Sequence, residues 1–187
     1  MASEREIRDL VRRVVDGLPP ADDAVAPESG TSESIAIGAD HGGYALKERL
    51  IAHLTDQGRQ VRDCGTDSPD SVDYPDFALA VAELVANGSC RWGVVIDGAG
   101  IGSCITANKV PGVRAALCYD ISSARNSREH NLANVLTLGA ALIGEGLAMQ
   151  ILDVWLATAW GSGRHARRVE KITEIDRRYR NISMTHG

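Results

Sequence analysis

The stretch that decides the fold is IAIGADHGGYALKERLIAHLTDQGRQVRDCG, residues 35–65. It opens with a short apolar strand, passes through a Gly-rich turn into a helical segment near Tyr44–Gln57, and ends in a second short strand, QVRDCG. Two strands joined by a helix lie parallel in one sheet, and the crossover between them is right-handed. The stretch therefore predicts a β-α-β unit.

The same alternation continues to the C-terminal side. Further strands are expected at WGVVI, RAALC and VLTLG, and further helices near 77–87, after the Gly loop at 98–102, near 122–131 and near 145–158. Five strands that alternate with helices are typical of a parallel sheet covered on both faces. We therefore predict an α/β, Rossmann-like three-layer fold with a five-stranded parallel sheet, in a domain over residues 35–187.

A separate amphipathic helix is expected over residues 1–18. Ser3 and Glu6 have the spacing of a capping box, and an apolar stripe recurs at intervals of three and four residues. The stripe consists of Ile7, Leu10, Val11, Val14, Val15 and Leu18. Residues 19–34 are rich in Pro, Ser, Asp and Ala without periodicity, which predicts a flexible linker.

Composition excludes several classes of protein. No apolar run approaches the roughly 20 residues that cross a bilayer, which argues against a membrane protein. The four cysteines have no CxxC spacing, which fits reduced thiols in the cytoplasm. The formal net charge of −5 argues against nucleic acid as the main partner. We expect a cytoplasmic protein that acts on a small molecule.

Polar residues collect where three predicted segments end or turn. These clusters are Asp40-His41-Gly42-Gly43, Asp73-Tyr74-Pro75 and the loop from Asp97 to Gly102. Ligands of parallel α/β sheets bind at the carboxyl ends of the strands, so one cleft could hold all three clusters. Turns also favour Asp and Gly for local reasons, which is the alternative for any one cluster.

The loop GAGIG at 98–102 is a candidate anion site. Glycines let backbone N–H groups approach a negatively charged oxygen closely, here at Gly98, Gly100 and Gly102. The GxGxxG fingerprint is absent, so we expect no nucleotide cofactor. The five histidines lack HxH or HExxH spacing, so we expect no metal.

A second candidate anion site is the basic stretch near the C-terminus. It contains Arg164, His165, Arg167, Arg168 and Lys171. A small anionic substrate needs only one such patch. The alternative is a solvated face of a helix.

Five ordered motifs resemble the ribose-5-phosphate isomerase B group, which also contains the galactose-6-phosphate isomerase subunits. The resemblance covers about residues 35–171, and the first 34 residues lie outside it. The motifs are GADHGGYALKERL, GTDSPDSVDYPDFA, GAGIG with TANKVPGVRAALC, SARNSREHNLANVLTLG, and GRHARRVEKI.

The resemblance implies an aldose–ketose isomerase of sugar phosphates that works through a cis-enediol, with ribose 5-phosphate as the default substrate. It also implies a homodimer or homotetramer whose active site draws on two subunits. It places three residues in the sugar pocket, two in ring opening and contact with sugar hydroxyls, and two arginines on the phosphate. These are Asp40, His41 and Tyr74; His130 and Asn131; and Arg164 and Arg168.

One departure concerns the base that moves the proton between C1 and C2. Many family members have Cys in a CGTGIG motif, where this chain has Asp97, with Ala99 in place of Thr. A second branch uses a Glu, where this chain has Ser103. A positioned carboxylate can do this chemistry, so we expect Asp97 to be the base. The alternatives are a changed substrate or a non-catalytic sugar-phosphate binding or assembly protein.

The N-terminal helix on its linker looks like the encapsulation peptides that bring enzymes into bacterial microcompartments. This resemblance implies shell proteins as partners of residues 3–18, and a location inside such a compartment. Packing onto its own domain is one alternative. Binding to a membrane surface is another, disfavoured because four acids dilute the basic face, at Glu4, Glu6, Asp9 and Asp16.

Overall fold

A computed structural model describes residues 33–183 of the chain. The predicted helix over residues 1–18 and nearly all of the predicted linker over 19–34 lie outside the described residues. None of the helices within the described range is long and apolar enough to cross a membrane.

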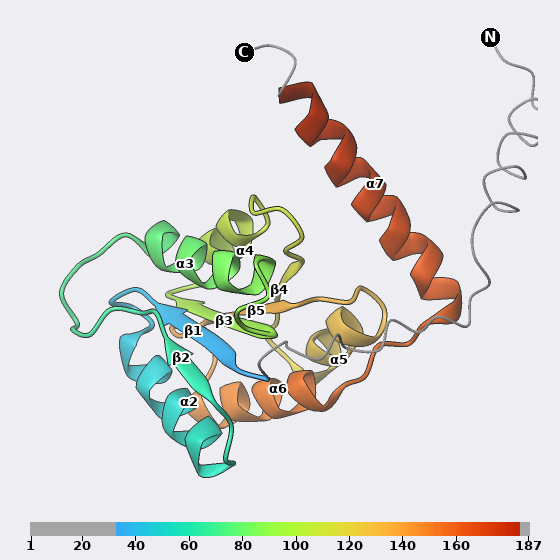
Figure 1. Ribbon diagram of the computed structural model, residues 1–187. Helices are drawn as coiled ribbons and strands as arrows, with labels where there is room; N and C mark the ends of the chain where they lie inside the picture. The colour runs from blue at the N-terminus through green and yellow to red at the C-terminus, as the bar shows by residue number, and fades with distance from the viewer. Residues whose placement is uncertain (1–32, 184–187) are drawn as a thin grey trace, which may run out of the picture. The chain divides into compact units, whose positions relative to one another are not determined.

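Five parallel strands form one sheet in the order β2-β1-β3-β5-β4 (Figure 1). Their bounds are β1 Ile35–Ala39, β2 Val61–Asp63, β3 Trp92–Asp97, β4 Ala115–Leu117 and β5 Val135–Gly139. The five-stranded parallel sheet expected from the sequence is confirmed.

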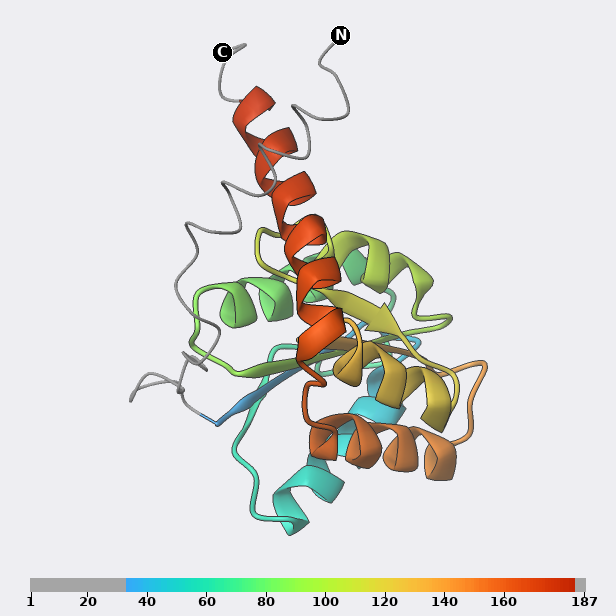
Figure 2. The same ribbon diagram turned by 90° about the vertical axis from the view of Figure 1, so that its right-hand side faces the viewer.

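Helices cover both faces of the sheet, as predicted. Figures 1 and 2 show α3 and α4 over one face and α2, α5 and α6 over the other. The bounds are α2 Tyr44–Asp56, α3 Tyr74–Ala86, α4 Ile101–Ala107, α5 Ile121–Glu129 and α6 Glu145–Ala157. A 3-10 turn at Gly163–His165 leads into the long helix α7, Ala166–Ser183.

Two apolar clusters hold the three layers together, because successive side chains of a strand point to opposite faces. Val94 and Ile96 of β3 belong to the cluster under α2 and α6, whereas Val95 belongs to the cluster under α3. Trp155 is fully buried in the first cluster. Burying a large apolar side chain contributes roughly 1.5–3 kcal/mol, so these layers dominate stability.

One boundary differs from the sequence-based expectation. Helix α3 begins at Tyr74 rather than near Phe77, because Pro75 occupies its first turn, where proline needs no N–H partner. The basic stretch at the C-terminus is helical, since it lies on the 3-10 turn and on α7. In Figure 2 α7 follows this turn, and Ile172 and Thr173 of α7 lie beside Val113 and Arg114, just before β4.

Candidate functional site

The sheet has a switch point between β1 and β3. From β1 the chain crosses to β2 on one side, whereas β3, β5 and β4 lie on the other. In open α/β sheets the crevice outside the carboxyl ends of such strands is where ligands bind. The loops after β1 and β3 both open there.

The structure brings the three polar clusters of the sequence together at this crevice. A Cβ added to Gly42 would lie 3.5 Å from the backbone nitrogen of Gly98. A Cβ added to Gly102 would lie 2.5 Å from Cζ of Tyr74. Tyr74 therefore packs directly over the Gly loop, and the turn after β1 packs against the start of that loop.

The carboxylate of Asp97 lies beneath the Gly loop and is only 5% exposed. Its Oδ1 accepts hydrogen bonds from the N–H groups of Ala99, at 2.8 Å, and Gly100. Its Oδ2 accepts from the N–H of Ser103 at 3.0 Å and from the Ser103 hydroxyl at 2.5 Å. A carboxylate offers about four acceptor positions, so Asp97 is fully hydrogen-bonded in this conformation. It anchors the loop to the first turn of α4.

This arrangement divides the N–H groups of the Gly loop into two sets. Those of Ala99 and Gly100 point to Asp97, and Gly100 adopts a φ of 75°, which glycine tolerates. Within residues 33–183, those of Gly98, Ile101 and Gly102 donate to no protein acceptor outside α4. The hydrogen bonds of the loop within this range therefore leave these three N–H groups unused.

The turn after β1 is shaped by its own polar side chains. Asp40 is buried and its Oδ1 accepts the Gly43 N–H at 3.0 Å. Nδ1 of His41 lies 3.2 Å from both the N–H and the carbonyl oxygen of Val72. His41 thus links this turn to the loop before α3, and the ring is exposed.

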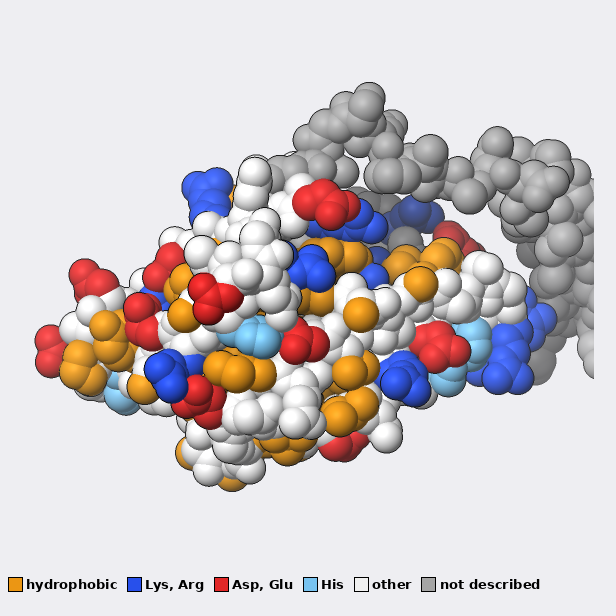
Figure 3. Space-filling model, turned by 90° about the horizontal axis from the view of Figure 1, so that it is seen from below, with side chains coloured by type: hydrophobic (Ala, Val, Ile, Leu, Met, Phe, Trp, Pro, Cys, Tyr) orange, Lys and Arg blue, Asp and Glu red, His pale blue; other side chains and the backbone are white. Residues whose placement is uncertain are grey.

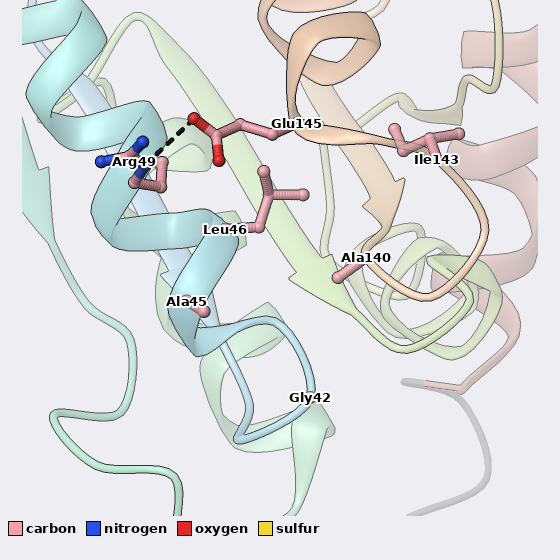
Figure 4. A pocket seen from close by; sticks show the side chains of 7 residues that line it. All are labelled: Gly42, Ala45, Leu46, Arg49, Ala140, Ile143 and Glu145. Carbon is pink, nitrogen blue, oxygen red and sulfur yellow. Dashed lines mark hydrogen bonds and ion pairs between the residues drawn. The ribbon is translucent and has the colours of Figure 1, made fainter.

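A pocket of about 440 Å³ adjoins this crevice between α2 and the loop after β5 (Figure 4). Gly42 and Ala140 form its end nearest the Gly loop, and the Ala140 N–H donates to the Asp97 carbonyl at 2.9 Å. Leu46 projects into it, and the Arg49 Nε donates to Glu145 Oε1 at 3.0 Å at its other end. No motif in the sequence points to this ion pair.

His130 and Asn131 lie at the opposite edge of the sheet from the crevice, where the strands begin. Helix α5 runs antiparallel to the strands, so its C-terminal end, capped by His130, returns to the edge where the strands begin. The Gly93 N–H at the start of β3 donates to the Asn134 carbonyl at 3.0 Å. The Gly161 N–H donates to the Glu129 carbonyl at 2.9 Å, which holds the segment before Arg164 at the same edge.

The rings of His130 and His165 stack with centroids 4.1 Å apart and an angle of 5° between them. The Arg164 Nε donates to His165 Nε2 at 3.3 Å. Burial lowers the pKa of His165, and the neighbouring His130, Arg164 and Arg168 lower it further. At the right-hand end of the face drawn in Figure 3, His side chains lie beside Lys or Arg side chains. The cluster is suited to an anion.

The turn that carries His130 and Asn131 is anchored by a buried arginine that the sequence analysis missed. Arg128 is 4% exposed, and its Cζ lies 3.9 Å from the ring centroid of Trp92 and 5.1 Å from that of Trp155. Its Nη1 donates to the Ala133 carbonyl at 2.5 Å. Burial lowers its pKa to about 10, with contributions from Arg91 and Arg114. The guanidinium therefore stays charged at neutral pH.

One chain does not bring the two clusters together. Four residue steps of β3, from Gly93 to Asp97, separate the edges, which is about 13 Å at the usual rise of a strand. The predicted residues therefore form two groups, hereafter the carboxyl-edge cluster and the amino-edge cluster. The first contains Asp40, His41, Tyr74, Asp97, Gly98, Gly100 and Gly102, and the second His130, Asn131, Arg164 and Arg168.

Three further features bear on the predicted chemistry. The thiol of Cys104 turns away from the loop and donates to the Ala115 carbonyl at 3.5 Å. The Tyr119 hydroxyl donates to the Ala99 carbonyl at 2.6 Å, a support of the loop that no motif signalled. Across residues 33–183, no group of three or more His, Cys, Asp or Glu is placed to hold a metal ion.

Comparisons with known proteins point to one family. Residues 35–172 match the model of the Ribose/Galactose Isomerase family. The chain is 45% identical over 146 residues to ribose-5-phosphate isomerase B of Escherichia coli (strain K12), covering 78% of this chain and 98% of the relative. These lengths show that the similarity spans the whole relative.

Solved structures give the same result. The ribose-5-phosphate isomerase B of Clostridium thermocellum is 53% identical with a TM-score of 0.77, covering 78% of this chain and 99% of that one. A ribose 5-phosphate isomerase of Thermotoga maritima is 44% identical with a TM-score of 0.74, covering 75% and 97%. The chain therefore belongs to the Ribose/Galactose Isomerase family.

Proposed function

We propose that the protein is an aldose–ketose isomerase of sugar phosphates that works through a cis-enediol. The observation that carries this is the crevice where Tyr74 and the turn after β1 pack on a Gly loop with free N–H groups. Ribose 5-phosphate is the first substrate to test, because the similar proteins of E. coli and C. thermocellum are named ribose-5-phosphate isomerase B.

The carboxyl-edge cluster holds the reacting end of the sugar. The free N–H groups of Gly98, Ile101 and Gly102 stabilise the oxygen that becomes negative in the enediolate, because fixed donors cost no reorganisation during the reaction. Asp40, His41 and Tyr74 line the sugar pocket around them. No metal or cofactor is needed for this step.

The amino-edge cluster holds the phosphate and the sugar ring. Arg164 and Arg168 bind the phosphate, because a guanidinium offers two parallel donors that match phosphate oxygens. His130 assists ring opening and Asn131 contacts sugar hydroxyls.

Asp97 is the proposed carbon base, and its hydrogen bonds set a condition on that role. Oδ2 can receive a proton from carbon only after the Ser103 hydroxyl, now 2.5 Å away, turns aside. The alternative is that Asp97 only anchors the loop and another group removes the proton.

A panel of four-, five- and six-carbon aldose phosphates tests the function. The expected result is turnover to the ketose phosphate, with exchange of the C2 proton into solvent.

The departure at Asp97 also favours a second candidate, a protein that binds sugar phosphates without converting them. Binding of a panel member without turnover would support that candidate.

The protein is proposed to act as a homodimer or homotetramer. Two groups of residues that belong to one reaction lie at opposite ends of the strands in one chain, and the length of β3 between those ends is about 13 Å. A second copy that places its amino edge against the carboxyl edge of the first would complete the site. Sedimentation of the full chain tests the assembly.

Residues 3–18 are proposed to dock the enzyme to the shell of a bacterial microcompartment. The support is in the sequence: an apolar stripe at helical spacing, followed by a linker of about 16 residues that gives it reach.

The test compares the full chain with a chain that starts at Ser34, and fuses residues 1–20 to a fluorescent protein. Turnover should be unchanged by truncation, and the fusion should co-purify with shell proteins. Loss of folding or turnover on truncation would favour packing on the domain instead, and failure of the fusion to associate with any shell would reject the docking role.

A further inference from the structure

The imidazole of His130 is held by neighbours on more than one side. The ring of His165 stacks on it at 4.1 Å between centroids. The side-chain amide nitrogen of Asn126 lies 2.7 Å from Nδ1, and the Glu129 Oε1 lies 3.7 Å from Nε2. Each ring nitrogen of His130 thus faces a group of defined polarity.

The contact with Asn126 fixes where the proton of the neutral ring lies. An amide nitrogen carries two hydrogens and no acceptor, so it can only donate. Nδ1 of His130 must therefore accept, which leaves the ring proton on Nε2. The carboxylate of Glu129 on the Nε2 side agrees with this tautomer, because it can only accept when ionised.

The orientation of the Asn126 amide is set from its other end. Its Oδ1 accepts a hydrogen bond from the side-chain amide of Asn131 at 3.1 Å. Asn131 also donates to the Asn126 backbone carbonyl at 3.2 Å. One side chain therefore contacts both members of the His-Asn pair, with its nitrogen toward His130 and its oxygen toward Asn131.

The place of Asn126 on α5 explains the arrangement. Asn126 and His130 are four residues apart, so they lie on the same face of the helix. Both line a pocket of about 210 Å³, together with Ser122 and Arg125. The pair thus borders an open pocket rather than the core.

We propose that Asn126 is a positioning residue that holds His130 as the Nε2–H tautomer and keeps Asn131 beside it. In this tautomer His130 presents its Nε2–H to a substrate oxygen as a hydrogen-bond donor. The role of the donor rests on the proposed function, whereas the tautomer is a property of the free protein.

Two variants change the hydrogen bonds of residue 126 while they keep a side chain of similar size. Asn126→Asp keeps the shape but offers only acceptors, so Nδ1 should become protonated. Asn126→Leu removes both hydrogen bonds at similar size. Ser122→Ala is the matched control, because it borders the same pocket but no hydrogen bond joins its side chain to His130 or Asn131. Asn126 is exposed, so these changes should leave the fold intact.

The first measurement is the tautomer of His130 by nitrogen-15 NMR of the full chain without ligand. At a pH where the parent's ring is neutral, the expected result is Nε2–H in the parent and in Ser122→Ala, a protonated Nδ1 in Asn126→Asp, and a mixture in Asn126→Leu. Nδ1–H in the parent would overturn the proposal, and so would unchanged Nε2–H in both Asn126 variants.

The second measurement is steady-state turnover of the sugar phosphate that the parent converts. We expect kcat of both Asn126 variants to fall by roughly ten- to a hundredfold with little change in KM, as for a misplaced group. Parental kcat in both would overturn the positioning role. If the parent converts no sugar phosphate, the proposed function fails, and the NMR result still decides the tautomer.

Discussion

At the scale of single residues, Asp97 is the position where chemistry and architecture compete. The same carboxylate that is proposed to take a proton from carbon also accepts four hydrogen bonds beneath the Gly loop. If Asp97 only anchors the loop, removing its charge should leave turnover wherever the loop stays folded. If Asp97 is the base, removing its charge should abolish turnover even with the loop folded. A substitution that keeps the volume therefore tests both roles.

We predict that Asp97→Asn abolishes exchange of the C2 proton, because the amide keeps the size and loses the base. Asp97→Cys, the residue of many family members, is expected to retain part of the turnover. Solvent-deuterium incorporation measures the exchange, and binding of the sugar phosphate measures whether the loop is intact. Parental turnover by Asp97→Asn would assign the base elsewhere.

The two arginines of the amino-edge cluster give a second prediction. Arg164→Ala or Arg168→Ala should weaken binding of the sugar phosphate by about 1.5–3 kcal/mol, the usual effect of losing a hydrogen bond to a charged group. Arg167→Ala is the control, because it removes an equal charge between them. Titration calorimetry provides the comparison, and equal affinities in all three variants would reject this phosphate site.

His165 gives a prediction about pH. Burial is the largest cause that lowers its pKa in the folded state, and His130, Arg164 and Arg168 lower it further. An unfolded histidine has a pKa of about 6.5. Below that pH the unfolded chain binds a proton that the folded chain refuses, so stability falls as pH decreases until the folded state also protonates. His165→Asn should remove part of that fall.

Urea unfolding of the parent and of His165→Asn at pH 7.5 and pH 5 measures this effect. The parent should lose more stability between the two values than the variant does. An identical loss in both proteins would show that His165 does not contribute to it.

At the scale of elements, the apolar runs predicted the strands and helices well because their alternation follows from burial alone. The start of α3 at Tyr74 was not predicted. Pro75, which is typical of the first turn of a helix, was interpreted as part of a turn. The hydrogen bonds of Asp97 could not be predicted from the motif. They depend on the chain folding back at Gly100, whose φ is 75°.

The contact between α3 and the Gly loop can be tested through Gly102. A Cβ there would lie 2.5 Å from the Tyr74 ring, so Gly102→Ala must displace the ring or the loop. We expect kcat/KM to fall by roughly ten- to a hundredfold, as for a misplacement of about 1 Å. In the control, Gly146→Ala, the new Cβ meets no atom within 4 Å. Equal kinetics in the two variants would contradict the proposed packing of the site.

At the scale of the whole molecule, the residues implied by the family resemblance divide between two edges of the sheet. Along the chain the carboxyl-edge residues come first, from Asp40 to Gly102, and the amino-edge residues follow, from His130 to Arg168, but the motifs do not show that the two sets lie at opposite edges. The topology does: loops after strands lie at one edge and the turns after helices at the other. Sequence patterns alone predicted one cleft at the carboxyl edge and a separate basic stretch that contains Arg164 and Arg168, and the resemblance added His130 and Asn131.

A site completed by a second copy predicts that two inactive variants restore each other. Asp97→Asn disables the carboxyl edge, and the double variant Arg164→Ala with Arg168→Ala disables the amino edge. In a two-fold dimer, one site of each mixed pair then combines an intact carboxyl edge from one chain with an intact amino edge from the other. Random mixing makes half of the dimers mixed, so about a quarter of the parental activity should return.

Co-expression with two different tags and sequential purification isolates the mixed dimers, whose turnover should reach about half of the parental value per dimer, since one of two sites is intact. Mixing two differently tagged copies of the double variant is the control, because every site then lacks both arginines and no pairing of chains repairs the amino edge. If purified mixed dimers of the first pair stay as inactive as the control, each chain must assemble its own site. The amino-edge cluster would then have to reach the Gly loop by a rearrangement of the chain, because about 13 Å of β3 separates them in the conformation described.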